Sequence, residues 1–406
     1  MNRIINIVCF FIPVASVRRS LRVRWHSRWV RYKNTPGVFM RHLTGRPVVL
    51  WIDHALGGGT EVYSKHQFKT LCHKFDVLRL QYFPETQLYH LTFACNRYWL
   101  YQTRDLVEIV ALVTKAQPQE IVVNNLVAYN STLDMLRTIT QIKQTCLVPP
   151  HISFRGHDFQ SICPSFNLIN CDGIYCNLSY VGGCERCWKH KKLADNPTSH
   201  KFLKSGATSI CDWRRAWGDF FCHTVDEVIL FAEPIAEIFV RAYPEIKDKI
   251  KIIPHAVRNY RHAKIKPHDD INIVVLGNIS YQKGAGVIRD MATKLPQGVN
   301  IIVVGEMKNA PNNITVHGKY NAKKLPQIME KYDADIVLIP SIWPETFSYT
   351  TSEAMSMALP IGCFDMGAPA ARAGLYERGL VLREINPQKN LEQIISFIKK
   401  LRATKN

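Results

Sequence analysis

Glu345 and Glu353 are two carboxylates eight positions apart, and the segment between them is rich in hydroxyl side chains. An apolar run at residues 335–340 precedes them and predicts a buried strand, while hydroxyls at 348–351 are candidate N-caps of a following helix. Both carboxylates would then lie where strand gives way to helix, beside helix N–H groups that attract phosphate. Because carboxylates accept hydrogen bonds from sugar hydroxyls, this pattern predicts a site for a nucleotide sugar.

The segment at residues 344–360, PETFSYTTSEAMSMALP, resembles the E-x7-E signature of retaining GT-B glycosyltransferases of group 1, or family 4. In that family the first Glu contacts hydroxyls of the donor sugar, the second holds the nucleotide ribose, and the amides between them meet the diphosphate. The resemblance assigns these donor-binding roles to Glu345, to Glu353 and to the backbone of Phe347, Ser348 and Tyr349. Two isolated glutamates would be solvated side chains of an amphipathic helix, but the preceding strand and the following Ala-Leu-Pro favour the signature.

The composition is that of a soluble globular protein with an unusual charge. With 406 residues the chain is long enough for two domains, and 47% hydrophobic and 21% charged residues are ordinary values. The net charge of +19 is not ordinary, and it indicates an anionic partner. Twelve cysteines occur without a convincing secretion signal, so reduced thiols in a cytosol are expected rather than a disulfide framework.

Residues 1–45 form a basic N-terminal segment, and residues 1–50 hold ten Arg or Lys with no Asp or Glu. The apolar run at 4–17 lacks a small-residue cleavage site, contains Pro13, and is shorter than the roughly 20 residues of a spanning helix. The Arg- and Trp-rich stretch at 18–31 suits an anionic bilayer surface. Peripheral membrane contact is therefore expected, although a helix packed on the parent domain would show the same pattern.

The first domain is expected at residues 46–257. A strand at 47–53 is followed by Gly57, Gly58 and Gly59 and then by a helix, so that the backbone can approach a ligand closely. These glycines match the loop that starts the N-terminal domain of the same glycosyltransferases, which implies a donor-binding role. Strand-like and helical runs then alternate, which predicts a parallel sheet covered by helices.

His157 and Asp158 follow an apolar stretch at the position where a strand would end. In the family a His-Asp pair here lies in the interdomain cleft, with its His close to the donor sugar or the acceptor. The resemblance therefore makes both residues catalytic candidates, with Asp158 supporting His157 or contacting the acceptor hydroxyl. A single His is more often structural, and that interpretation stays open.

A cysteine-rich insert follows at residues 159–190. Cys184 and Cys187 form a CxxC, and Cys163 and Cys176 could complete a tetrahedral set for structural zinc. The spacing differs from the paired CxxC motifs of a zinc ribbon, so independent buried thiols or a redox CxxC remain alternatives. Some polysaccharide glycosyltransferases carry a similar insert.

The second domain is expected at residues 271–390, after a linker at 258–270 and before a C-terminal helix at 391–406. A strand leads to Gly277, Asn278 and Lys283, and a Lys beside Gly at such a turn can reach a diphosphate. The family pairs an Arg with this Lys, where this chain has Asn278, so the Arg role does not carry over. The family also implies that the C-terminal helix packs back on the first domain.

Asp333 and Asp335 imitate a metal-binding DxD motif. Because they precede a buried strand, they are expected to form its entry, and no metal or other cofactor is expected for catalysis.

The resemblance implies an α/β protein of GT-B fold: two Rossmann-like domains facing each other across a cleft, with the cysteine-rich insert in the first. It implies a retaining, metal-independent hexosyltransferase that uses a nucleotide-diphosphate sugar and a saccharide or lipid-linked saccharide acceptor, in capsule, lipopolysaccharide or O-antigen biosynthesis. The basic segment places the chain in the cytoplasm, peripherally on the inner face of the plasma membrane.

Two other functions compete with this prediction. A sugar-nucleotide epimerase could use the same fold, and a basic zinc-containing nucleic-acid-binding protein would explain the charge and the cysteines. The second requires basic residues interleaved with aromatics on the folded domains, whereas the densest basic stretch precedes them. Nucleic acid is therefore not expected as a partner.

Overall fold

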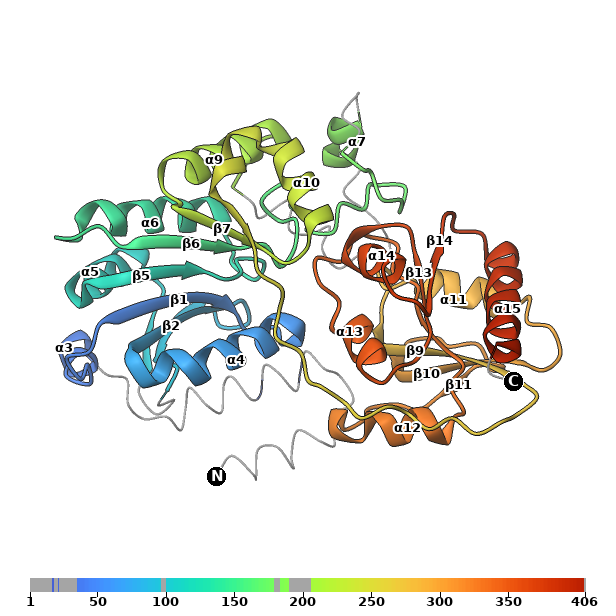
Figure 1. The fold of residues 1–406 in the computed structure, drawn as a ribbon. Coiled ribbons are helices and arrows are strands. Elements are labelled where there is room, and N and C mark those ends of the chain that lie inside the picture. Colours follow the sequence, from blue (N-terminus) through green and yellow to red (C-terminus); the bar gives the residue numbers. More distant parts are fainter. Residues whose placement is uncertain are drawn as a thin grey trace. The chain divides into compact units, whose positions relative to one another are not determined.

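The computed structural model describes residues 17, 21, 35–95, 100–178, 183–189 and 206–404. The segment expected to touch a bilayer, at 4–31, lies outside the described residues apart from Val17 and Leu21. Nowhere in the described residues is there a helix that is both long and apolar enough to span a membrane. The chain divides into two compact units, and each contains its own sheet (Figure 1).

The first unit consists of residues 1–161, 203–229 and 245–251. Its sheet has eight strands in the order β4-β3-β2-β1-β5-β6-β7-β8. The strands are β1 (Val48–His54), β2 (Asp76–Phe83), β3 (Leu88–Phe93), β4 (Leu100–Thr103), β5 (Pro118–Val123), β6 (His151–Arg155), β7 (Glu227–Leu230) and β8 (Ile250–Ile252). The strands from β2 through β1, β5 and β6 to β7 pair in parallel, whereas β3 and β4 add an antiparallel edge.

Several helices of this unit begin at a residue whose side chain caps the helix N-terminus. The helices are α3 (Pro36–Met40), α4 (Gly58–Lys74), α5 (Leu106–Ala116), α6 (Thr132–Thr145) and α9 (Ile210–His223), with a 3-10 turn η1 (Pro244–Lys249). Asp105, Ser131 and Ser209 each accept a backbone N–H at the start of α5, α6 and α9. All seven residues of β1 are buried, as expected for a parallel strand with helices on both faces.

The first domain starts earlier in the chain than the predicted boundary at residue 46. Phe39 on α3 is fully buried, and its ring lies 5.0 Å from the ring of Phe93 and 6.2 Å from that of Tyr101. This aromatic contact joins α3 to the antiparallel edge of the sheet. Residues 36–40 therefore belong to the folded domain rather than to the basic segment.

Short strands account for the main errors in the predicted elements. Residues 212–243 have a helical pattern, but β7 divides it between α9 and α10 (Glu233–Ala242). The antiparallel pair β3 and β4 was not predicted either. The strands β4 and β7 have only four residues each, too few to show a clear period of two.

The second unit contains residues 162–202, 230–244 and 252–406. Its six strands are all parallel, in the order β11-β10-β9-β12-β13-β14. They are β9 (Ile271–Ile279), β10 (Val299–Met307), β11 (Thr315–Val316), β12 (Ile336–Ile339), β13 (Ile361–Phe364) and β14 (Gly379–Leu382).

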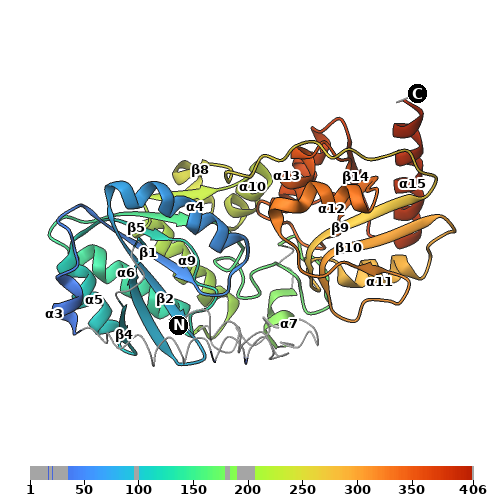
Figure 2. The same cartoon turned by 90° about the horizontal axis from the view of Figure 1, so that it is seen from below.

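The helices of this unit are α7 (Gly183–Lys189), α10, α11 (Ala285–Ala292), α12 (Leu325–Lys331), α13 (Tyr349–Ser356), α14 (Gly367–Gly374) and α15 (Pro387–Ala403), with a 3-10 turn η2 (Ala322–Lys324). The helices from α11 to α15 cover both faces of the sheet. Alternate residues of β9 point into two separate apolar clusters: Ile273 packs with α11 and α15, and Val274 packs with α12, α13 and α14. Figure 2 shows α12 and α13 on one side of β9 and β10, and α11 on the other. A parallel sheet with helices packed on both faces is a Rossmann-like layer structure.

The C-terminal helix packs on the sheet of the second unit, and its expected contact with the first domain stays a prediction. α15 runs alongside β14 (Figure 1), and Leu391, Ile394 and Ile398 lie in the apolar cluster shared with α11. Its apolar stripe is therefore already buried within its own domain.

The cysteine-rich residues also group with the second unit, although the sequence predicts them in the first. The Tyr281 hydroxyl donates to the Gly173 carbonyl at 3.0 Å, and Arg241 of α10 donates to the Asn177 side chain at 3.0 Å. These contacts tie residues 162–178 to elements of the second unit.

One pair of cysteines contradicts the expectation of reduced thiols. Cys72 near the end of α4 forms a disulfide with Cys95, which follows β3. The pairing depends on β3, which folds back beside β2 and brings Cys95 toward α4. It was therefore not predictable without that strand.

Candidate active site

The predicted strand, loop and helix around the two glutamates are present. All four residues of β12 are buried, and after the loop α13 begins at Tyr349. Its N-cap residue, Ser348, has a φ of 66°, a backbone conformation that few non-glycine residues adopt. The chain therefore bends sharply at the point where the helix N–H groups begin.

Lys283 and Glu345 form an ion pair beside this bend. The Lys283 Nζ lies 2.7 Å from a carboxylate oxygen of Glu345, whose side chain is only 4% exposed, and the Ser341 hydroxyl donates to the same carboxylate. Burial alone raises the pKa of Glu345, but the charge of Lys283 and hydrogen bonds from Lys283, Ser341 and Ser348 bring it below its usual value. Glu345 is therefore an ionised acceptor at neutral pH.

A glycine places Lys283 there. Gly284 has a φ of 80°, and a Cβ atom at this position would overlap the carbonyl oxygen of Pro340 at the end of β12. Only a residue without a side chain lets the loop after β9 lie so close to β12. Gly277, near the end of β9, faces the first turn of α13, since a Cβ on it would be 3.9 Å from the Thr350 methyl group. Asn278 is exposed at the end of β9.

Glu353 lies in a separate polar cluster with two residues of the predicted linker. Burial raises its pKa to about 7, although the neighbouring Tyr260 hydroxyl and the charge of Arg258 act in the opposite direction. The Arg258 guanidinium lies 5.9 Å from the centre of the Tyr260 ring. Glu353 is thus a carboxyl group that titrates near neutral pH, next to an aromatic hydroxyl and a cation.

A buried histidine packs against the loop that carries the expected phosphate-binding amides. The ring of His255 lies 4.3 Å from the ring of Phe347 and 5.2 Å from that of Tyr349. Burial, assisted by the charge of Arg372, lowers the pKa of His255 to about 3. The ring is therefore neutral at physiological pH and packs as an aromatic side chain. The side chains of Phe347 and Tyr349 are therefore held in place by packing against His255.

The glycine-rich loop of the first unit lies where it was predicted, between β1 and α4. Gly57 and Gly58 have φ values of 82° and 79°, and a Cβ at either position would meet open space. These positions thus favour glycine because of the backbone and not because of crowding. Gly59 lies in the first turn of α4, whose N–H groups face the loop.

His157 ends a buried hydrogen-bond chain. Its Nε2 lies 2.9 Å from Oδ1 of Asn124, and Nδ2 of Asn124 donates to the Asp53 carboxylate at 3.1 Å. Arg79 pairs with Asp53 at 2.7 Å, so Asp53 is the acceptor and the Asn124 amide nitrogen must face it. The Asn124 oxygen then faces His157, which requires the proton of the imidazole to be on Nε2.

Asp158 has a different set of partners. Its carboxylate accepts from the Asn125 side chain at 2.7 Å and from the Gln160 backbone N–H at 2.8 Å. These bonds stabilise the turn after β6, next to His157.

Comparisons with known proteins agree with this architecture. Residues 251–403 match the sequence model of the family glycosyl transferases group 1. Solved structures that resemble the chain include Anabaena HepE in complex with UDP-glucose (15% identity, TM-score 0.53, covering 87% of this chain and 90% of that one). Sucrose-phosphate synthase from Thermosynechococcus elongatus is similar (13% identity, TM-score 0.55, 87% and 91%), as is the lipopolysaccharide outer core galactosyltransferase WaaB (11% identity, TM-score 0.55, 87% and 90%). No curated protein matches the sequence.

The fold is GT-B. The matched family range contains Lys283, Glu345 and Glu353, so the second Rossmann-like domain of this GT-B chain is similar to those of group 1 glycosyltransferases.

Cys163 lies close enough to Cys187 to affect its pKa, but the predicted set of four zinc ligands is not assembled among the described residues. Among the residues that the structure describes, which include Cys163, Cys176, Cys184 and Cys187, no group of three or more metal-ligating side chains could hold an ion. Cys187 instead accepts the backbone N–H of Cys171 at 3.3 Å. Burial, together with the neighbouring thiols, raises the pKa of Cys187 to about 12, which also speaks against a redox CxxC because such motifs need a thiolate.

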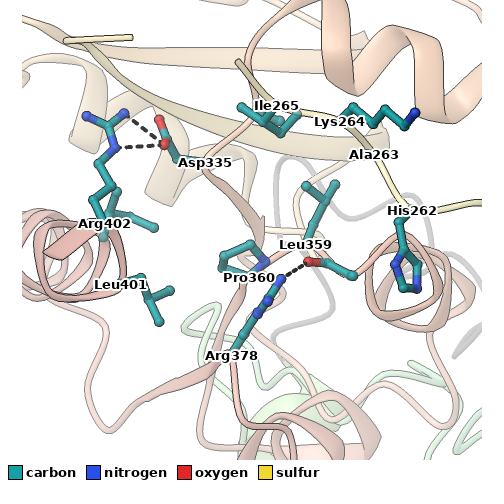
Figure 3. Close-up of a pocket in the computed structure, with 13 residues that line it drawn as sticks. His262, Ala263, Lys264, Ile265, Asp335, Leu359, Pro360, Arg378, Leu401 and Arg402 are labelled. Carbon is teal, nitrogen blue, oxygen red and sulfur yellow. Dashed lines mark hydrogen bonds and ion pairs between the residues drawn. The ribbon is translucent and has the colours of Figure 1, made fainter. Parts of the chain in front are cut away.

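The DxD sequence forms the entry to β12. Asp335 accepts the Asn272 backbone N–H at 2.8 Å and pairs with Arg402 of α15 at 2.8 Å, as drawn in Figure 3. Both contacts lie at the amino end of β12, beside a pocket of about 350 Å³ that Leu359 and Pro360 also line. In a parallel sheet this is the end opposite to the loop that carries Glu345.

Sequence reasoning missed the residues that surround the glutamates. Tyr260 and Arg258 come from the predicted linker, His255 from the turn after β8, and Arg372 from α14. Their types are common and their spacing carries no period, so only the fold shows that they reach the site.

Proposed function

We propose that the chain is a glycosyltransferase that transfers a hexose-type sugar from a nucleotide-diphosphate donor to a saccharide or lipid-linked saccharide acceptor, with retention of configuration. The observation that carries the proposal is the Lys283–Glu345 ion pair beside the N-terminus of α13, eight residues before Glu353. This arrangement offers a cation and helix amides for a diphosphate, and carboxylates for hydroxyl groups.

The donor-site residues take distinct roles in the proposal. Glu345 orients hydroxyls of the sugar, and Glu353 holds the ribose. Lys283 and the amides from Phe347 to Tyr349 stabilise the charge that grows on the departing diphosphate. An ammonium group has three donors, so Lys283 can contact phosphate while it keeps Glu345.

His157 and Asp158 belong to the acceptor domain in this proposal. His157, with its tautomer held by Asn124, contacts a hydroxyl of the sugar or acceptor, while Asp158 supports His157 through the turn that both share or contacts the acceptor hydroxyl. The acceptor hydroxyl loses its proton to the departing phosphate on the same face of the sugar, so that retention needs no enzymic nucleophile and no metal.

The biological setting is proposed from the composition and from one structural neighbour. WaaB is a galactosyltransferase of the lipopolysaccharide outer core, which supports a role in lipopolysaccharide, capsule or O-antigen assembly. The net charge of +19 and the basic residues 1–45 support a peripheral position on an anionic membrane, at its cytoplasmic face.

Thermal unfolding against a panel of UDP, GDP, ADP, CMP and dTDP sugars tests the donor site. A ligand that binds only the folded protein stabilises it by about 2.7 kcal/mol at one hundred times its Kd. One nucleotide sugar should shift the wild type and the control Glu377→Ala, whose side chain is exposed, but not Glu353→Ala. If no nucleotide sugar shifts the wild type, the proposed function is wrong.

Turnover distinguishes the transferase from an epimerase on the same fold. The effective nucleotide sugar is incubated with and without saccharide acceptors, and its products are separated by chromatography. A transferase forms the glycosylated acceptor, whose anomeric configuration shows retention or inversion. Conversion of one nucleotide sugar to another without acceptor would identify an epimerase instead.

A further inference from the structure

The first turn of α14 packs directly on the loop that precedes α13. Gly367 has a φ of 64°, and a Cβ on it would come within 2.7 Å of the Pro344 backbone. The Ala368 N–H donates to the Glu345 carbonyl at 2.9 Å. The first turn of α14 therefore fixes the backbone conformation of the loop that carries Glu345.

Arg372 extends this contact by one helical turn. Its guanidinium donates to the carbonyls of Phe347 and Ser348, the latter at 3.0 Å, and to the Ser352 hydroxyl. It also lies 4.7 Å from the centre of the Phe347 ring. A planar guanidinium suits this combination of several acceptors and an aromatic face, whereas an ammonium group does not.

The bonds made by Arg372 determine the direction of the neighbouring amides. In a trans peptide the C=O and the following N–H point in opposite directions. Since the carbonyls of Phe347 and Ser348 point at Arg372, the N–H groups of Ser348 and Tyr349 point away from it. These N–H groups start the first turn of α13, where the helix itself provides no acceptors.

Arg372 also brings a positive charge that lacks a close counter-ion. Burial lowers its pKa to about 10, while Glu345 and Cys363 raise it, so the group remains charged at neutral pH. No carboxylate of the described residues lies within 4.0 Å of its guanidinium. A half-buried cation of this kind is stabilised when an anion approaches.

We propose that Arg372 is a positioning residue for the diphosphate of the donor. It turns the peptides at 347–349 so that their N–H groups face the phosphates, and it places a positive charge behind them. This inference rests on the proposed function and adds a residue to its diphosphate site.

A purely structural role for Arg372 predicts a different result from the proposed one. Loss of a structural anchor lowers the stability of the protein and reduces its affinity for all ligands of the site to the same extent. Loss of a diphosphate-positioning residue weakens nucleoside diphosphates more than the corresponding monophosphates, because the sugar and base contacts persist. The ratio of the two affinities therefore separates the roles.

The test uses the full chain with Arg372→Met and Arg372→Lys. The control is Arg378→Met, since Arg378 also donates to a backbone carbonyl, that of Ala358 at 2.8 Å, but at the amino end of β13 (Figure 3). Calorimetry measures the Kd of UDP, GDP, ADP, CDP and dTDP and of the matching monophosphates, and circular dichroism checks folding. Hydrogen bonds to a charged group are worth about 1.5–3 kcal/mol, so Arg372→Met should reduce the diphosphate-to-monophosphate preference by about 10- to 100-fold.

Each outcome decides the proposal. Arg372→Lys, which keeps the charge, should retain part of the preference, and Arg378→Met should retain all of it. An unchanged preference in a folded Arg372→Met or Arg372→Lys protein would overturn the role of Arg372. A wild type that binds the diphosphates no better than the monophosphates would also overturn it. A wild type that binds none of these nucleotides would instead refute the proposed function.

Discussion

The ammonium group of Lys283 lies 2.7 Å from the carboxylate of Glu345, so two groups assigned to different parts of the donor hold each other in its absence. Lys283 comes from the loop before α11 and Glu345 from the loop before α13. Their pairing keeps the buried Glu345 carboxylate ionised and holds the two side chains next to each other. The ion pair therefore prepares the site before the donor binds.

Removal of the cation tests this relationship. Lys283→Met should reduce kcat/KM by about 100-fold, because both the diphosphate contact and the charge that keeps Glu345 ionised are lost. Lys283 is 35% exposed, so the loss of unfolding free energy should be at the lower end of about 1–3 kcal/mol. Kinetics and urea denaturation of Lys283→Met, Glu345→Gln and the double variant measure both effects. Strictly additive effects would show that the two residues act independently.

Glu353 should make stability fall as pH rises toward neutrality. Burial raises its pKa to about 7 in the folded state, compared with 4.5 for the ordinary group. Between these values the folded state binds more protons than the unfolded state, so unfolding free energy decreases with pH, by at most about 3 kcal/mol. Urea denaturation at several pH values should show a steeper decline for wild type than for Glu353→Gln. Equal slopes would contradict the assignment.

Donor binding should depend on the same group with the opposite sign. A ribose bound through its hydroxyls needs an ionised acceptor, so affinity should increase as pH rises through about 7, by up to about tenfold per pH unit below that value. Nucleotide sugars are suitable probes because their phosphates do not titrate there. Calorimetry of wild type and Glu353→Gln from about pH 5.5 to about pH 8.5 measures the difference. A pH-independent wild type would exclude Glu353 as the titrating contact.

The sequence predicted those parts of the site that are local in the chain. β12, the hydroxyl-rich loop and α13 follow one another within a short segment, and each has its own signal: an apolar run, caps and helical periodicity. Lys283 was predicted for the same reason, since it follows β9 directly. Gly284 confirms why a glycine was needed beside it.

The partners of these residues were not predictable because they depend on packing. Arg372 reaches Phe347 from a helix that starts twenty residues later, and Tyr260 reaches Glu353 from a segment with no regular structure. The packing of α15 on α11 was not predicted for a related reason: its apolar stripe indicates that it packs, but not against which element.

The disulfide between Cys72 and Cys95 predicts a measurable effect of reductant. It closes a loop over a sequence separation of 23, for which the chain-entropy model gives a stabilisation of about 3 kcal/mol. The double variant Cys72→Ser/Cys95→Ser and reduced wild type should both unfold at lower urea than oxidised wild type. Cys211→Ser, which removes an exposed thiol, is the control and should not change the midpoint. Equal midpoints with and without reductant would show that the bond is absent in solution.

The Asp53–Asn124–His157 chain predicts which nitrogen of His157 carries the proton. Asn124 offers its oxygen to His157 at 2.9 Å because its nitrogen is bound to Asp53, so nitrogen NMR of the wild type should show the Nε2–H tautomer. In Asn124→Ala this constraint is lost, and a mixture of tautomers should appear while kcat falls by about 10- to 100-fold. Asn313→Ala is the control, because it removes an amide that donates to the Ala292 carbonyl in the second unit. It should change neither the tautomer of His157 nor kcat. If Asn124→Ala keeps both the tautomer and kcat, then Asn124 does not position His157.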